Sequence, residues 1–240
     1  MSLKQSIPNS ITSMNLLSGA MGVISTFQGE MGQAFFFLLA AAVFDFCDGL
    51  AARLLKVVSP MGKELDSLSD MVSFGLLPSV MLVKTLWMLG VTSLVSWLPL
   101  FLAVMSGLRL AKFNVDERQT ADFIGLPTPS SAAICASLCY FIYFQPDSLL
   151  AAWAAHWWVL PLLALVLGLL LVSEIPMFGM KVAPGHKLLD TKRIVLLVAV
   201  VGCILLTVLL HQNWSLAVLL VFSFYLGENL LLAFIRLLRR

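Results

Sequence analysis

Charged residues are scarce in this chain: Asp, Glu, Lys and Arg together make up 12% of its 240 residues, whereas 60% are hydrophobic. The mean hydropathy is correspondingly high, at +0.97. A water-soluble domain of this size could not bury so much apolar surface. The composition therefore excludes a soluble globular protein and predicts an integral membrane protein.

Cysteine and histidine are also sparse, with four and three copies. The cysteines form no CxxC pair, and the histidines form no HExxH pattern. Zinc sites are built mainly from these two residue types at short spacings. We therefore expect no zinc centre, cysteines that serve as packing residues, and histidines that take no part in catalysis.

The excess of positive charge is only +2. It is too small and too spread out to indicate nucleic acid as a partner, whereas anionic membrane lipids are a natural partner for the basic residues. The N-terminus lacks a basic stretch followed by an apolar run and a cleavage site, so we expect no removable signal peptide. Residues 1–13 are instead predicted to form a short segment at the membrane interface.

Long apolar runs fill most of the chain. A spanning helix needs about 20 apolar residues, and the sequence offers about eight candidates. They are residues 14–28, 31–55, 66–87, 93–112, 128–145, 157–173, 193–210 and 214–235. We predict an all-α integral membrane protein, a bundle of about eight transmembrane helices in one domain over 1–240. Residues 14–173 would form a six-helix core, and residues 193–235 two additional C-terminal helices.

Four aspartates stand at regular intervals on two adjoining apolar runs: Asp45 and Asp48, then Asp66 and Asp70. Residues three or four positions apart share a helix face, so an antiparallel pair of helices would gather all four carboxylates around one point. Such carboxylates repel one another unless cations neutralise them. An all-oxygen site suits Mg²⁺, Mn²⁺ or Ca²⁺, and the charge fits two ions better than one.

The alternative interpretation is that these acids are ordinary helix-end residues that pair with basic neighbours. The candidate partners are Arg53, Lys56 and Lys63.

Lys and Arg gather on alternate connections between the apolar runs. The groups are Lys4; Arg53, Lys56 and Lys63; Arg109, Lys112 and Arg118; Lys181, Lys187, Lys192 and Arg193; and Arg236, Arg239 and Arg240. Positive residues favour the cytoplasmic side of a membrane. We therefore expect a multi-pass protein of the cell (inner) membrane, with both termini and the aspartates facing the cytoplasm.

Small and basic residues frame the aspartates in a fixed order. The stretch reads Asp45-x-x-Asp48-Gly49-x-x-Ala52-Arg53 and, after eight residues, Gly62-x-x-x-Asp66-x-x-x-Asp70. This order resembles the signature of the CDP-alcohol phosphotransferase family, and every defining position is present. The resemblance implies that the four aspartates hold two divalent cations, Mg²⁺ or Mn²⁺. It also implies that Asp70 doubles as the base that takes a proton from an incoming hydroxyl.

The same resemblance suggests how the donor binds and how the protein assembles. Gly49 and Ala52 would leave room for a cytidine diphosphate against the helix backbone, and Arg53 would contact its phosphates. Gly62 belongs to the same set, with a role as a helix-start residue as the alternative. The family also implies a homodimer.

Sequence outside the aspartate motif bears on the acceptor. The relevant stretches are Pro8-Asn9-Ser-Ile-Thr12-x-x-Asn15, Ser73-Phe74-Gly75, Arg109-Leu-Ala-Lys112-Phe113-Asn114 and Phe123-Ile-Gly125-Leu126-Pro127-Thr128-Pro129. They resemble the serine-accepting branch of the family, which implies transfer of the phosphatidyl group of CDP-diacylglycerol to the hydroxyl of L-serine, with release of CMP. Residues 125–130 also read as a turn before a helix.

A bound serine needs a cation beside its carboxylate. We expect Arg109 to bind that carboxylate or the lipid phosphate, with Lys112 and Asn114 nearby. The alternative is that Arg109 and Lys112 are anchors at the cytoplasmic membrane surface.

Other functions stay open. The same chemistry with glycerol 3-phosphate or an inositol phosphate as acceptor would require a denser basic pocket near Asp70. Membrane prenyltransferases also bind a diphosphate through aspartates, but with different spacing. A cation transporter could carry its ion on buried acids, although the sequence shows no internal repeat. Glu228 and Asn229 lie inside the last apolar run, where an acid is either functional or paired with a basic residue.

Overall fold

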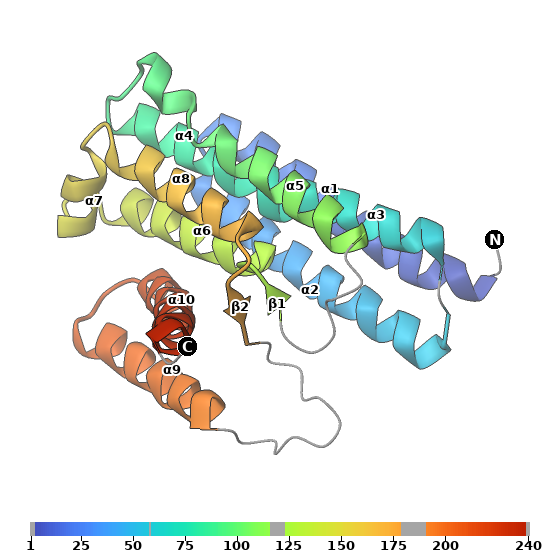
Figure 1. Cartoon of the computed structure of the whole chain (residues 1–240). Helices are drawn as coiled ribbons and strands as arrows, with labels where there is room; N and C mark the ends of the chain where they lie inside the picture. Colours follow the sequence, from blue (N-terminus) through green and yellow to red (C-terminus); the bar gives the residue numbers. More distant parts are fainter. Residues whose placement is uncertain (1–2, 58, 116–122, 179–190, 239–240) are drawn as a thin grey trace.

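A computed structural model describes residues 3–57, 59–115, 123–178 and 191–238 of the chain (Figure 1). Helices account for nearly all of this part. They are α1 (Leu3–Gln28), α2 (Met31–Leu55), α3 (Pro60–Asp70), α4 (Leu77–Met88), α5 (Leu100–Val115), α6 (Thr128–Phe144), α7 (Leu149–Ala154), α8 (Val159–Val172), α9 (Thr191–Leu209) and α10 (Ser215–Leu238). The all-α prediction is confirmed.

Four helical stretches in the described residues are long and apolar enough to cross a membrane. They are Met31–Leu55, Pro60–Met88, Leu94–Val115 and Ser215–Leu238. Shorter apolar helices cover Thr128–Phe144, Val159–Val172 and Arg193–Leu209. The membrane character is thus confirmed, while a total of eight spans stays a prediction.

Several helix bounds differ from those expected, and two of the differences lie near the aspartates. Residues 3–13 are the first turns of the continuous helix α1 rather than a separate segment, and their place at the membrane interface stays a prediction. The third apolar helix begins at Pro60, six residues before the expected start at Asp66. Ser59 caps it by accepting a hydrogen bond from the Gly62 amide (3.2 Å), and Pro60 fits the first turn because its missing amide proton is not needed there.

The helix α1 holds the site end of the bundle together. It packs along α2 and also along α3 and the π-helical turn Met71–Leu76 that follows α3. The consecutive helices α2 and α3 themselves make few contacts. Their facing sides are therefore joined mainly through α1.

A close contact fixes α1 against the π-helical turn. The Ser73 hydroxyl donates to the Asn15 carbonyl (3.0 Å). A Cβ atom on Gly19 would lie 2.3 Å from Ser73 Oγ and 2.8 Å from Ser73 Cα. Only glycine allows this approach of the two backbones.

The remaining helices complete the bundle around α6. The helix α4 packs on α6, α5 packs on α8, and α10 packs on both α6 and α9. Figure 1 shows the α9–α10 pair (orange and red) at the side of the bundle, next to α6.

Two short strands lie beside α10. The strand β1 (Phe123–Ile124) pairs antiparallel with β2 (Pro176–Met177), with Phe123 opposite Met177. Gly125 follows with φ +78° and donates from its amide to the Ile175 carbonyl (2.9 Å). The expected turn before α6 is confirmed.

We predict that Gly19→Ala destabilises the protein by about 1–3 kcal/mol, because the added methyl overlaps Ser73. Gly202→Ala in α9 is the matched control, since a Cβ there meets no atom within 4 Å. Melting of the purified protein in detergent should show a lower midpoint for the first variant and an unchanged or slightly higher one for the second. Equal midpoints would contradict the close contact.

Candidate active site

Three of the four predicted aspartates come together in the structure. Asp45 and Asp48 on α2 and Asp66 on α3 each offer a carboxylate oxygen, and these oxygens lie within 4.8 Å of one another. Asp70 lies outside this group, but its charge interacts with those of Asp45 and Asp66. The two helix faces therefore meet as the spacing predicts, with Asp70 set to one side of a three-carboxylate cluster.

Polar side chains of α1 orient two of these carboxylates. The Thr12 hydroxyl donates to Asp48 Oδ2 (2.5 Å), and the Asn15 amide donates to Asp70 Oδ1 (3.2 Å). The Ser69 hydroxyl in turn donates to the Thr12 carbonyl (3.2 Å). Hydrogen bonds to a carboxylate stabilise its charged form, so α1 both positions and stabilises the acids.

The cluster fits a divalent cation. Asp48 is buried, at 6% exposure. In the described part of the chain, the buried oxygen Asp66 Oδ1 has no hydrogen-bond partner. A buried carboxylate oxygen left without a partner is costly, and oxygen ligands are those that Mg²⁺ and Mn²⁺ prefer. The residues present thus suit such an ion.

A cavity of about 260 Å³ opens beside the cluster. Its walls come from α1, α2, α3 and the connection between α2 and α3, and the lining residues are Gln5, Pro8, Asn9, Thr12, Asp48, Gly49, Ala52, Val57, Ser59, Gly62, Lys63 and Asp66. A Cβ on Gly49 would meet no protein atom within 4 Å. The cavity is therefore next to the helix backbone at Gly49.

Gly62 and Arg53, which were also predicted to bind the nucleotide, occupy different positions. Gly62 approaches α1 closely, because a Cβ there would lie 2.9 Å from Asn9 Oδ1. Gly62 thus lines the cavity and also lies in the first turn of α3. Arg53 is exposed, and its Nε donates to the Gly49 carbonyl (2.9 Å).

The basic neighbours offered as partners for the acids make other contacts. Lys63 Nζ donates to the Asn114 carbonyl (2.8 Å), and Arg53 Nε to a carbonyl of its own helix. Lys56 ends α2 in the left-handed conformation, with φ 51°, and is exposed. These contacts favour a functional interpretation of the aspartates over simple helix-end pairing.

Sequence reasoning assigned no role in the site to Asn9, Thr12 and Asn15. All three are buried on α1, and the cavity or the carboxylates lie next to them. Their spacing of three residues places them along one side of a helix. That periodic polar stripe in an apolar helix was the signal that could have identified them.

Arg109, on α5, is within electrostatic range of Asp70. It is buried at 8% exposure and donates from Nη1 to the Thr128 hydroxyl (2.8 Å). Its guanidinium carbon is 5.9 Å from the centre of the Phe113 ring. In the described residues its Nε has no hydrogen-bond partner, and its charge interacts with that of Asp70. A buried guanidinium with a spare donor can accept an anionic group.

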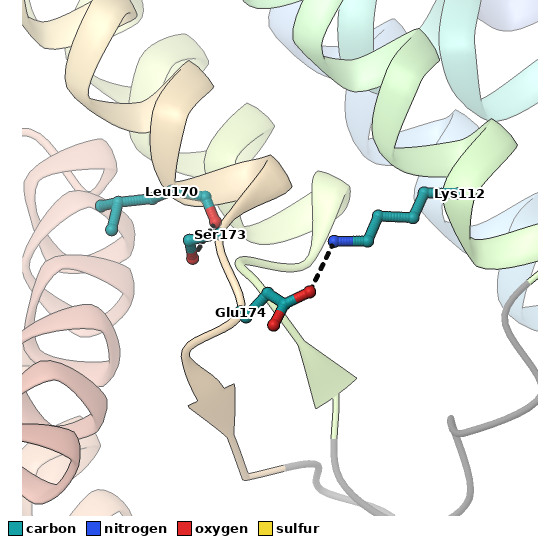
Figure 2. Close-up of polar contacts among 4 residues, drawn as sticks. All are labelled: Lys112, Leu170, Ser173 and Glu174. Carbon is teal, nitrogen blue, oxygen red and sulfur yellow. Dashed lines mark hydrogen bonds and ion pairs between the residues drawn. The ribbon is translucent and has the colours of Figure 1, made fainter.

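The other two predicted acceptor residues face elsewhere. Lys112 extends toward Glu174, with 3.4 Å between Nζ and Oε1, at the segment where α8 ends beside Ser173 (Figure 2). Asn114 Nδ2 donates to the Ser67 hydroxyl (2.9 Å), next to Asp66. Arg109 is thus the one of the three that is buried.

Residues 5–170 match the sequence model of CDP-alcohol phosphatidyltransferase. A Bacillus subtilis protein named CDP-diacylglycerol–serine O-phosphatidyltransferase is 35% identical over 141 residues, which cover 57% of this chain and 76% of that protein.

Relatives of the same name occur in other lineages. The Methanocaldococcus jannaschii protein is 30% identical over 169 residues, covering 70% of this chain and 72% of that protein. The Mycobacterium leprae protein is 35% identical over 182 residues, covering 72% of this chain and 58% of that protein.

We predict that Asp66→Asn weakens Mn²⁺ binding by at least about tenfold, because it removes a charged oxygen ligand. Glu64→Gln is the matched control, since Glu64 is an exposed acid on the same helix. Titration of the detergent-solubilised protein with Mn²⁺, followed by electron paramagnetic resonance, measures the affinity. Equal affinities for the two variants would argue against a metal site at the cluster.

Proposed function

The chain belongs to the CDP-alcohol phosphatidyltransferase family, and on this premise we propose that it transfers the phosphatidyl group of CDP-diacylglycerol to the hydroxyl of L-serine, releasing CMP. The observation that carries the proposal is one arrangement: a three-carboxylate cluster beside a cavity, with Asp70 in electrostatic range of both the cluster and a buried arginine. The relatives named for this reaction support serine as the acceptor.

The donor would bind through the cavity beside Gly49. Gly49 and Ala52 line it on α2, and Gly62 lines it on α3. Small residues let a nucleotide approach the helix backbone. Lys63, also in the lining, and the exposed Arg53 would provide positive charge for the phosphates.

The aspartates would hold divalent cations. The family is generally dependent on such ions, and Asp45, Asp48 and Asp66 form the acidic cluster. We propose Mg²⁺ or Mn²⁺, two ions in all, with Asp70 as a further ligand. When bound, a divalent cation neutralises the pyrophosphate and stabilises the leaving phosphate.

Asp70 would act as the general base. Asn15 holds its Oδ1 (3.2 Å), and the other oxygen can take the proton from the serine hydroxyl. The serine oxygen then forms a bond to the phosphorus that carries the lipid, while the bond from that phosphorus to CMP breaks. CMP leaves with the electron pair of that bond.

Arg109 would bind the carboxylate of serine. It is the sole buried Lys or Arg among the described residues. One buried cation matches the single carboxylate of an amino acid, whereas a phosphate-bearing acceptor would need more positive charge. Lys112 and Asn114 would then support the edge of the acceptor site, Lys112 through its ion pair with Glu174 and Asn114 through its hydrogen bond to Ser67.

The orientation, the membrane and the assembly belong to the same proposal. We place the site and both termini on the cytoplasmic side of the cell membrane, because the basic groups fall on alternate connections. Several of those residues lie outside the described part of the chain: Arg118, Lys181, Lys187, Arg239 and Arg240. A homodimer is proposed from family membership alone.

We predict that the purified protein, given CDP-diacylglycerol and Mg²⁺ or Mn²⁺, releases CMP with L-serine and not with glycerol 3-phosphate or inositol phosphate. Asp70→Asn should lower the rate by at least about 100-fold, the range typical of a lost general base. Asp147→Asn, an exposed acid after α6, is the control and should keep the wild-type rate. Release with another acceptor would keep the family and overturn serine; no release with any acceptor would overturn the enzyme proposal.

We further predict that Arg109→Ala raises the KM for L-serine by about 10- to 100-fold, since a hydrogen bond to a charged group contributes about 1.5–3 kcal/mol. The KM for CDP-diacylglycerol should change little. Lys84→Ala serves as the control. It also removes a positive charge, but the Lys84 Nζ donates to the Phe27 carbonyl (3.3 Å). An unchanged serine KM in Arg109→Ala would remove Arg109 from the acceptor site.

A further inference from the structure

The C-terminal helix α10 lies beyond residue 170, where the match to the family model ends. It carries two buried polar residues one helical turn apart, Tyr225 at 8% exposure and Asn229 at 1%. Asn229 Nδ2 donates to the Tyr225 carbonyl (2.8 Å). Buried polar groups in an apolar helix are costly and are seldom placed there without a task.

These two side chains hold both backbone polar groups of one residue. Asn229 Oδ1 accepts from the Phe178 amide (2.8 Å), and the Tyr225 hydroxyl donates to the Phe178 carbonyl (3.0 Å). The Phe178 and Tyr225 rings also pack edge to face, with 5.4 Å between their centres. The Asn229 side chain thus contacts backbone groups on both of its polar atoms.

Phe178 directly follows β2, and a continuous set of backbone contacts leads from there to Arg109. The strand β2 pairs with β1, and the next residue, Gly125, donates to the Ile175 carbonyl (2.9 Å). The Leu126 amide then donates to the Leu170 carbonyl (2.9 Å). The helix α6 begins two residues later at Thr128, whose hydroxyl accepts from Arg109 (2.8 Å).

The turn in this path has no room to shift. A Cβ on Gly125 would lie 2.5 Å from the Leu171 carbonyl oxygen and 2.9 Å from that of Ser173. Its φ of +78° is also one that side chains with a Cβ rarely adopt. A displacement of the β1–β2 layer would therefore be passed on to Thr128.

Tyr225 also lies near Arg109. The Arg109 guanidinium is within electrostatic range of both Asp70 and Tyr225. The Tyr225 phenol donates its proton to the Phe178 carbonyl, so its oxygen keeps lone pairs for a neighbouring cation. Arg109 is thus near both the proposed base and the C-terminal helix.

We infer that α10 completes the acceptor side of the site, with Tyr225 and Asn229 as positioning residues that hold Arg109 and the Phe123–Thr128 segment where the acceptor carboxylate binds. The inference rests on the proposed function only in requiring that an anionic acceptor binds at Arg109. The donor cavity lies on α1, α2 and α3, away from this path. The two residues therefore affect the acceptor and not the donor.

The test compares KM values for both substrates in Tyr225→Phe and Asn229→Leu. Tyr225→Phe keeps the ring that packs on Phe178, so the fold is retained, and it removes only the hydroxyl. Tyr143→Phe makes the same chemical change in α6 and is the matched control. We expect the KM for the acceptor to rise about tenfold in Tyr225→Phe and at least as much in Asn229→Leu, with the KM for CDP-diacylglycerol within about twofold of wild type and no change in the control.

Two results would overturn the inference: an unchanged acceptor KM in both variants, or parallel losses for donor and acceptor together with a lower melting temperature. The assay is run with the acceptor that the wild-type protein uses. If that acceptor is not L-serine, the proposed substrate is wrong, yet the same KM comparison still decides the role of α10. Stabilisation of the melting temperature by the acceptor provides a second measure of its binding that needs no turnover.

Discussion

Mutual repulsion among carboxylates held close together in an apolar bundle is the constraint on which this structure depends. Asp45, Asp48 and Asp66 come within 4.8 Å of one another on helices that otherwise make few contacts. The helix α1 bridges them and supplies hydrogen bonds to Asp48 and Asp70 from Thr12 and Asn15. Without α1, Asp48 and Asp70 would lose these two side-chain donors, which orient the carboxylates and stabilise their charge.

The same arrangement divides the site in two. On one side, α1, α2 and α3 enclose the cavity beside Gly49. On the other, Arg109 lies against Thr128 and Phe113, within the electrostatic range of Asp70. Asp70 interacts electrostatically with the cluster and with Arg109, and it lies immediately before the π-helical turn Met71–Leu76. Such turns often occur at functional sites, and this one is held by Ser73 against α1. In the proposed reaction, Asp70 at this position would take the proton of the acceptor.

Burial explains why so few polar groups can define each side. In an apolar environment an unsatisfied donor or acceptor is expensive, so Asp66 Oδ1 and Arg109 Nε, both buried and without a partner in the described residues, mark positions where a ligand would be favoured. On α10, in contrast, Tyr225 and Asn229 form hydrogen bonds with the backbone of Phe178. A well-positioned binding pocket requires polar groups that are free to bind the ligand and supporting residues whose own hydrogen bonds are already formed.

Local features follow directly from the order of the residues: the apolar helices, the i, i+3 and i, i+4 aspartate pairs that share helix faces, and the turn at Gly125. These depend on residues a few positions apart, whose geometry a helix or a turn fixes. The tertiary structure alone decided the rest, namely that Thr12 meets Asp48 across 36 residues, that Asn15 meets Asp70 across 55, and that Lys112 turns to Glu174 across 62. It also brought Asn229 to Phe178. Such partners depend on how helices pack against one another, and a single sequence carries no local signal for that packing.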